Sequence, residues 1–61
     1  MDANLAKQLE GKPIAFRKKD NPYTLIGFLL EVTPSHIIIS FRDRKQIHSL
    51  EDIVDMEEGF Q

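Results

Sequence analysis

The sequence predicts a mainly β protein, in which a short N-terminal α-helix precedes a five-stranded, strongly bent antiparallel barrel. Residues 23–41 are the most hydrophobic stretch, and they consist of two apolar runs on either side of a Thr-Pro-Ser turn at 33–35, as in a hairpin. Gly27 lies in the middle of the first run. Glycine weakens a strand unless the backbone must bend or approach another element closely, so a sharp bend is expected there.

Length and composition indicate one small soluble domain, residues 1–61. A chain of 61 residues is near the lower limit for folding around a single core. The absence of cysteine excludes disulfides and thiolate metal sites. No stretch is long enough to span a membrane as a helix, and the N-terminus lacks the pattern of a signal peptide, so a cytoplasmic location is expected.

The N-terminal residues predict a short helix that lies on the barrel. Asp2 is a suitable N-cap, Leu5 and Leu9 are one turn apart, and Gly11 followed by Pro13 ends the segment. Such a short helix is not stable alone. We therefore expect both leucines to pack on the strands.

The rest of the chain predicts five strands, over residues 14–18, 23–32, 36–41, 45–49 and 53–56, with one helical turn at 50–52. Alternation in the first strand places Ile14 and Phe16 inside, and Ile47 is expected inside on the fourth. Gly59 is expected to end the last strand, followed by Phe60 and Gln61.

The second strand is apolar on both faces. If Ile26, Phe28 and Leu30 face the core, then Leu25 and Leu29 must meet the helix or another subunit. The alternatives are a monomer whose helix covers this surface and a homo-oligomer that contacts itself through strand edges.

Charges are segregated along the chain, although the net charge is only −2. Alternate hairpin tips of a meander fall at the same end, so the first and third tips should lie together, opposite the acidic residues near position 51. The expected basic end consists of Arg17, Lys18, Lys19, Arg42, Arg44 and Lys45.

Such a basic end would suit a nucleic acid. Arginine and lysine at adjacent tips could hold phosphates, and Tyr23 or Phe41 could stack on a base. The alternative is that these tips are charged simply to remain solvated and to prevent edge pairing.

The pattern Leu25-x-Gly27-x-Leu29-x-x-Val32 resembles the first signature of the Sm, Lsm and Hfq-type proteins. The resemblance implies an Sm-like (SH3-like) barrel that binds RNA and forms rings by pairing the fourth strand of one subunit with the fifth of the next. The spacing of His48 before residues 50 and 53 is similar to that of the Hfq-type histidine, which implies a pocket at His48.

Residues 27–35 and 50–54 also resemble the small Veg-type regulators of Gram-positive bacteria. This second resemblance implies a bacterial regulator with the same Sm-like fold.

The sequence does not predict an enzyme, a metal or another cofactor. His36 and His48 lack carboxylate or thiolate partners at ligand spacing. Ser35 and His36 are expected to point to opposite faces of a strand, and therefore not to form a nucleophile–base pair. The acids at residues 51–58 are expected to be solvated.

We therefore expect a non-enzymatic binding module, with RNA or another nucleic acid as the favoured partner. One alternative is a protein-interaction module that regulates transcription or translation. The other is a structural subunit of an assembly, such as a phage or spore component.

Overall fold

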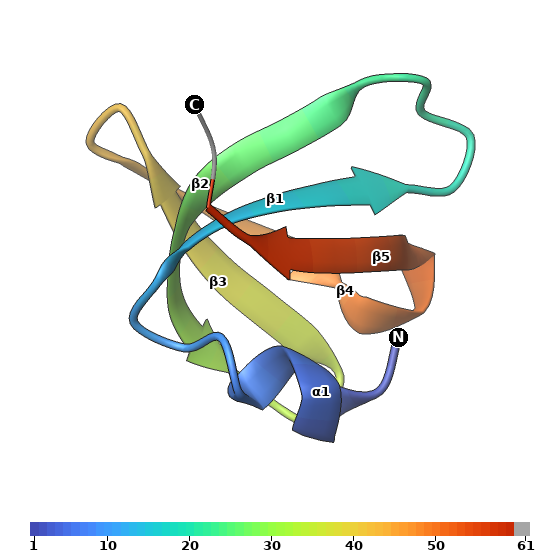
Figure 1. The fold of residues 1–61 in the computed structure, drawn as a ribbon, viewed down its shortest axis with the longest axis horizontal. Helices are drawn as coiled ribbons and strands as arrows, with labels where there is room; N and C mark the ends of the chain where they lie inside the picture. The colour runs from blue at the N-terminus through green and yellow to red at the C-terminus, as the bar shows by residue number, and fades with distance from the viewer. Residues whose placement is uncertain (60–61) are drawn as a thin grey trace.

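The computed structural model describes residues 1–59, and Phe60 and Gln61 lie outside the described residues. The described chain contains one helix, five strands and a 3-10 turn (Figure 1). In chain order these are α1 (Ala3–Lys7), β1 (Pro13–Lys18), β2 (Thr24–Val32), β3 (His36–Phe41), β4 (Arg44–Ser49), η1 (Leu50–Asp52) and β5 (Ile53–Glu58). These elements confirm the predicted mainly β fold with a short N-terminal helix.

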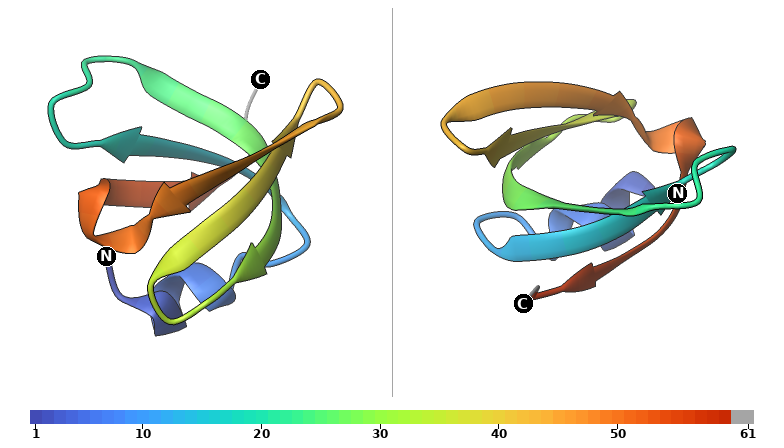
Figure 2. Two further views of the ribbon diagram at one scale, coloured as in Figure 1. Left: turned by 180° about the vertical axis from the view of Figure 1, so that it is seen from behind. Right: turned by 90° about the horizontal axis from the view of Figure 1, so that it is seen from above.

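All five strands belong to one antiparallel sheet with the order β4-β3-β2-β1-β5. β4 and β5 are its two edges, and no ladder joins them within residues 1–59, so the sheet is open and the predicted closure into a barrel is not found. The right-hand view of Figure 2 shows that the sheet is nevertheless strongly curved. β3 and β4 lie on one side, β1 and β5 on the other, and β2 curves from one side to the other.

The curvature is concentrated in the middle of β2. Its first half, as far as Phe28, pairs with β1, and the half that begins at Phe28 pairs with β3, with a bulge between Leu29 and Glu31. Gly27 is buried at this crossing, where a Cβ atom would lie 3.0 Å from Ile39 Cδ1 and 3.2 Å from the backbone oxygen of Ser40. The glycine therefore permits the close approach of β3, as the sequence predicts.

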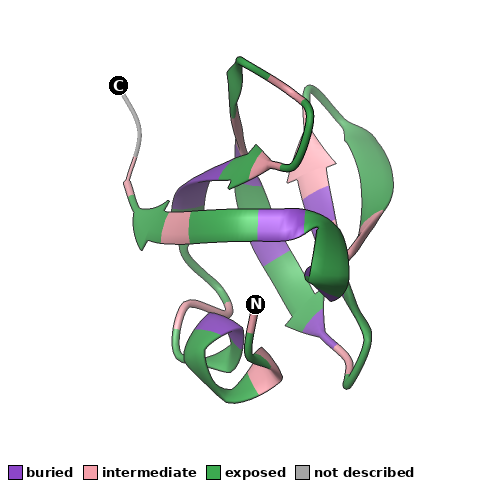
Figure 3. Ribbon diagram, turned by 90° about the vertical axis from the view of Figure 1, so that its right-hand side faces the viewer, coloured by how far each residue is buried: buried purple, intermediate pink, exposed green. Residues whose placement is uncertain are grey.

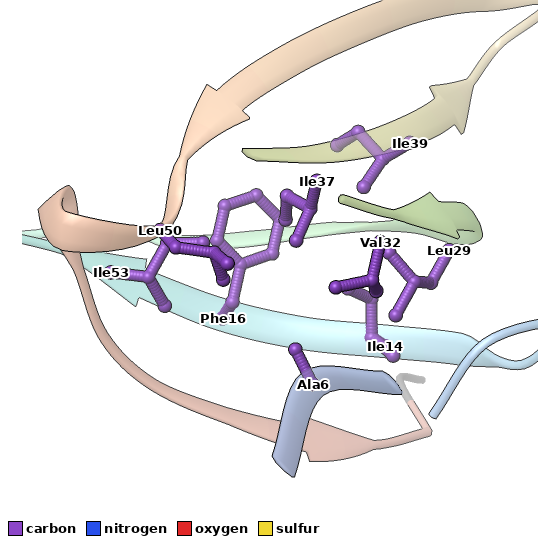
Figure 4. Close-up of a cluster of buried hydrophobic side chains, with 9 residues drawn as sticks. All are labelled: Ala6, Ile14, Phe16, Leu29, Val32, Ile37, Ile39, Leu50 and Ile53. Atoms are coloured by element: carbon purple, nitrogen blue, oxygen red, sulfur yellow. The ribbon is translucent and has the colours of Figure 1, made fainter. Parts of the chain in front are cut away.

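The core fills the concave side of the sheet. In Figure 4, Phe16 lies beside Ile37, Leu50 and Ile53 toward the end near η1, whereas Ile14 lies with Leu29 and Val32 toward the other end. Figure 3 colours the residues by burial, and the alternation expected for a sheet with one face against the core is clear in β3, where Ile37 and Ile39 are buried, whereas β1 has three consecutive buried residues and β4 has none. The inward positions of Ile14 and Phe16 are confirmed.

Of the two apolar faces of β2, the one that carries Leu29 is against the core, and not the one that carries Phe28 and Leu30. Leu29 is fully buried, whereas Phe28 and Leu30 are 43% and 41% exposed on the convex side. Both parities of β2 are apolar, so only the direction of the curl decides which one is enclosed. Ile47 is likewise on the convex side, 67% exposed, and its predicted inward position is wrong.

The helix packs on the sheet through a different residue from the one expected. Asp2 caps α1 by accepting a hydrogen bond from the backbone N–H of Asn4 at 2.9 Å. Ala6 is fully buried and Leu9 packs against the core, but Leu5 is 55% exposed. The helix ends at Lys7 and is shorter than predicted, because residues 8–11 form turns.

The segment after the helix is tied to β2 by hydrogen bonds. Gly11, with φ of +80°, donates its backbone N–H to the carbonyl oxygen of Leu29 at 2.8 Å. The Oε2 atom of Glu10 accepts a hydrogen bond from the backbone N–H of Val32 at 2.7 Å. These bonds satisfy polar groups of β2 beyond the end of the β1 ladder.

Candidate nucleic-acid interface

The six cations expected at one end lie in two separate regions. The loop between β1 and β2 and the turn between β3 and β4 are on opposite sides of the molecule in Figures 1 and 2. Lys18 pairs with Ile53 at the start of β5, and the backbone N–H of Lys19 donates to the carbonyl oxygen of Asp52 at 2.8 Å. The first loop thus lies against the acidic η1 turn. The predicted basic end is wrong because the bend in β2 rotates the two hairpins apart.

Arg17 forms an ion pair with Asp55. It lies opposite Asp55 in the β1–β5 ladder, and its Nε donates to both carboxylate oxygens, at 3.1 and 3.2 Å, while Nη2 donates to Oδ2. This hydrogen bonding raises the pKa of Arg17 and lowers the pKa of Asp55. The two side chains are exposed, but their forked geometry occupies the guanidinium face that a phosphate would use.

Lys18 is directed toward His48, across the gap between β1 and β4. Its Nζ lies 3.1 Å from His48 Nδ1, and because an ammonium can only donate, Nδ1 is the acceptor. The Nε2–H group then donates to Gln46 Oε1 at 3.0 Å, and the imidazole meets Phe16 edge-on, with 5.2 Å between ring centroids. Burial, followed by the charge of Lys18, lowers the pKa of His48.

His48 therefore links the two sides of the curved sheet, and both of its ring nitrogens contact other side chains of the chain. The pocket expected at this residue stays a prediction. A hollow of about 340 Å³ lies elsewhere, over β1, β2 and β5. The Arg17–Asp55 pair and Glu57 line it, so its charge does not suit a polyanion.

The other three cations are together on the β3–β4 hairpin. Phe41 pairs with Arg44, which leaves a two-residue turn of Arg42 and Asp43 with φ of 53° and 63°, as in a type I′ turn. Arg42, Arg44 and Lys45 are exposed, and none of them forms an ion pair with another described residue. Asp43 is the only acid of this hairpin, so the tip carries a net positive charge.

The two aromatic residues expected to stack on bases are differently placed. Tyr23 is 73% exposed but belongs to the loop between β1 and β2, which is on the side of the molecule away from the β3–β4 turn in Figure 1. Phe41 is at the hairpin, but the Arg42 guanidinium carbon lies over its ring, 5.1 Å from the centroid. One face of the Phe41 ring is therefore already occupied by a cation–π contact.

Phe28, considered in the sequence only as a possible core residue, is an exposed aromatic residue on β2. It is directly opposite Ser40, and Ser40 is directly opposite Lys45 on β4. Directly opposed residues of an antiparallel ladder share a face, so an aromatic ring, a hydroxyl group and an ammonium group form one row on the convex side. Both faces of β2 carry apolar side chains, so the sequence could have indicated that Phe28 is exposed only if the direction in which the sheet curls had been known.

The expected separation of Ser35 and His36 is also wrong. Ser35 Oγ lies 2.8 Å from His36 Nδ1, because Ser35 belongs to the turn and not to the regular strand. Both residues are exposed, and the Thr33 hydroxyl oxygen accepts the backbone N–H of each. The contact fits a hydrogen-bonded turn. Residues 1–59 contain no group of three or more histidine, cysteine or acidic side chains placed to hold a metal ion.

Comparison of the chain with protein-family models, curated proteins and solved structures gives no match. No helix formed by residues 1–59 is sufficiently long and apolar to cross a membrane. The functional proposal therefore depends on the residues of this chain alone.

Proposed function

We propose that this protein is a non-enzymatic binding module that holds the phosphates of RNA or another nucleic acid on its β3–β4 hairpin. The observation that carries the proposal is the set of three exposed cations there without an acidic partner among the described residues. Lys12 and Arg17, by contrast, form ion pairs with Glu58 and Asp55.

The expected affinity is modest and dependent on salt. The net charge of −2 provides no overall attraction to a polyanion, so the attraction must be local. For single strands, log K falls against log[salt] by about 0.7 per phosphate neutralised, so three contacts give a slope of about −2. A fourfold rise in salt should then lower the affinity about 20-fold.

Fluorescence anisotropy with a labelled oligo-U RNA tests the proposal. In R42A/R44A, one cation of the three remains, and the slope should fall to about −0.7, so that fourfold more salt costs only about threefold in affinity. K7A/K12A is the matched control, because it removes the same charge from exposed positions outside the hairpin. Equal slopes for the two double variants would contradict the proposal.

A second candidate function is self-association through the sheet edges, as in an Sm-like ring. The order of a helix and five strands, with Gly27 at the bend, supports the Sm-like interpretation. Both edges are free of partners within residues 1–59, and their charges are complementary. β4 carries Arg44 and Lys45, whereas the charged residues of β5 are all acidic.

Light scattering tests self-association directly. A defined oligomer at low salt that dissociates in K45E, but not in K7E, would support edge pairing between copies. A monomer at all concentrations would exclude it, without affecting the nucleic-acid proposal.

Binding of a protein partner through the apolar convex face would instead be insensitive to salt.

A further inference from the structure

The convex side of β2, β3 and β4 combines an exposed aromatic ring with one cation of the hairpin, Lys45. The row Phe28–Ser40–Lys45 crosses the three strands at one level. Neighbouring strands are about 4.8 Å apart, so Phe28 and Lys45 are separated by about 10 Å along the row. Leu30 and Ile47 extend the apolar part of this face on the side away from the hairpin tip.

The charge of the row Phe28–Ser40–Lys45 favours an anionic occupant. Lys45 forms no ion pair with a described residue, whereas Arg44, its neighbour on β4, belongs to the opposite face of the strand. Asp43 is in the turn, and Glu31, which is opposite Ile38 at the bulge of β2, lies on the same face beside the row but outside it. A purely apolar partner would leave the ammonium group without a counter-charge, whereas a nucleotide offers an aromatic base and a phosphate together.

We propose that Phe28 stacks on an unpaired base of a single-stranded nucleic acid, while Ser40 and Lys45 contact the adjoining phosphate. The inference rests on the proposed function, and it adds a site and a class of ligand to it. A single strand is required because the bases of a duplex are stacked on one another and cannot be placed on a ring of the protein surface. Phe28 takes this role because its ring is exposed, whereas Arg42 covers one face of Phe41.

Stacking of one base on an aromatic residue changes affinity by roughly 5- to 150-fold when the residue is replaced by alanine. F28A should therefore bind labelled oligo-U RNA at least fivefold more weakly, with an unchanged salt slope, because no charge is removed. F28Y should retain the wild-type affinity, because it keeps the ring. L30A is the matched control, since Leu30 is on the same strand and face with nearly equal exposure, and it should bind as the wild type does.

Binding to heparin and to a duplex shows whether the stacking site alone is wrong or the proposed function as a whole. Heparin is a polyanion without bases, so F28A should bind heparin as the wild type does, whereas R42A/R44A should bind it more weakly. If F28A binds oligo-U normally while R42A/R44A loses affinity, the stacking site is refuted and the proposed function stands. If R42A/R44A binds both ligands normally, the proposed function itself fails. Equal affinity for oligo-U and for a duplex of the same length would also overturn the stacking site.

Discussion

Replacement of Gly27 by alanine tests whether β2 and β3 approach as closely as the structure indicates. The new methyl carbon would lie 3.0 Å from Ile39 Cδ1 and 3.2 Å from the carbonyl oxygen of Ser40. The first neighbour is the end of a side chain and can move a little. The second is backbone held in the β2–β3 ladder, where Ser40 pairs with Phe28, so it cannot move without disturbing the pairing.

Two opposing effects set the size of the change. Overpacking a core typically costs about 1–3 kcal/mol. The substitution also removes the conformational freedom of glycine from the unfolded chain, which stabilises the fold by about 0.4–1 kcal/mol. The free energy of unfolding of G27A should therefore fall by about 1 kcal/mol or more, which lowers Tm by roughly 4–8 °C in a domain of this size.

A double-mutant cycle identifies the cause. I39V removes the Cδ1 atom and should by itself cost about 0.5–1.5 kcal/mol. If the contact is real, G27A/I39V should be more stable than the sum of the single changes predicts, by about 0.5 kcal/mol or more. Urea unfolding followed by circular dichroism measures all four proteins. A stabilised G27A, or strictly additive effects, would refute the close approach and with it the explanation for the bend.

Two other predictions concern stability. The pKa of His48 is lowered in the fold. As the pH falls through about 6.5, His48 is therefore protonated more readily in the unfolded chain than in the folded protein. The free energy of unfolding should therefore decrease from pH 7.5 toward pH 5, and H48Q should remove most of this dependence in urea titrations; an identical pH profile would contradict the assignment of neutral His48. E10A leaves the nearly buried backbone N–H of Val32 without its acceptor and should cost about 1–3 kcal/mol, whereas E31A, which alters an exposed side chain, should change the urea midpoint little.

The elements of this fold are readable from local sequence. Gly27 marks the bend because only a residue without a Cβ fits against β3, and the hairpin turn at 33–35 follows from Pro34 and its neighbours. Ile14 and Phe16 identify the inner face of β1 because the large apolar side chains of this strand fall on one parity, whereas the other carries Pro13, Ala15 and Arg17. In each case the physical cause lies within a few residues.

The arrangement of the site depends on contacts between distant segments and could not be predicted in this way. Both parities of β2 are apolar, so the sequence does not say that Phe28 lies outside. The direction in which the sheet curls moves the loop before β2 away from the β3–β4 turn, and no local pattern encodes that direction. The pairing of Arg17 with Asp55, 38 positions later, is likewise a product of the β1–β5 ladder.

Titration of the ¹⁵N-labelled protein with oligo-U RNA, followed by NMR, tests most directly whether the hairpin and the adjacent convex face form the binding surface. We predict amide shift changes at residues 40–46 and around Phe28, with η1 and β5 unaffected. Changes confined to the acidic β5 edge or to the loop at residues 19–23, or no change at saturating RNA and low salt, would contradict it.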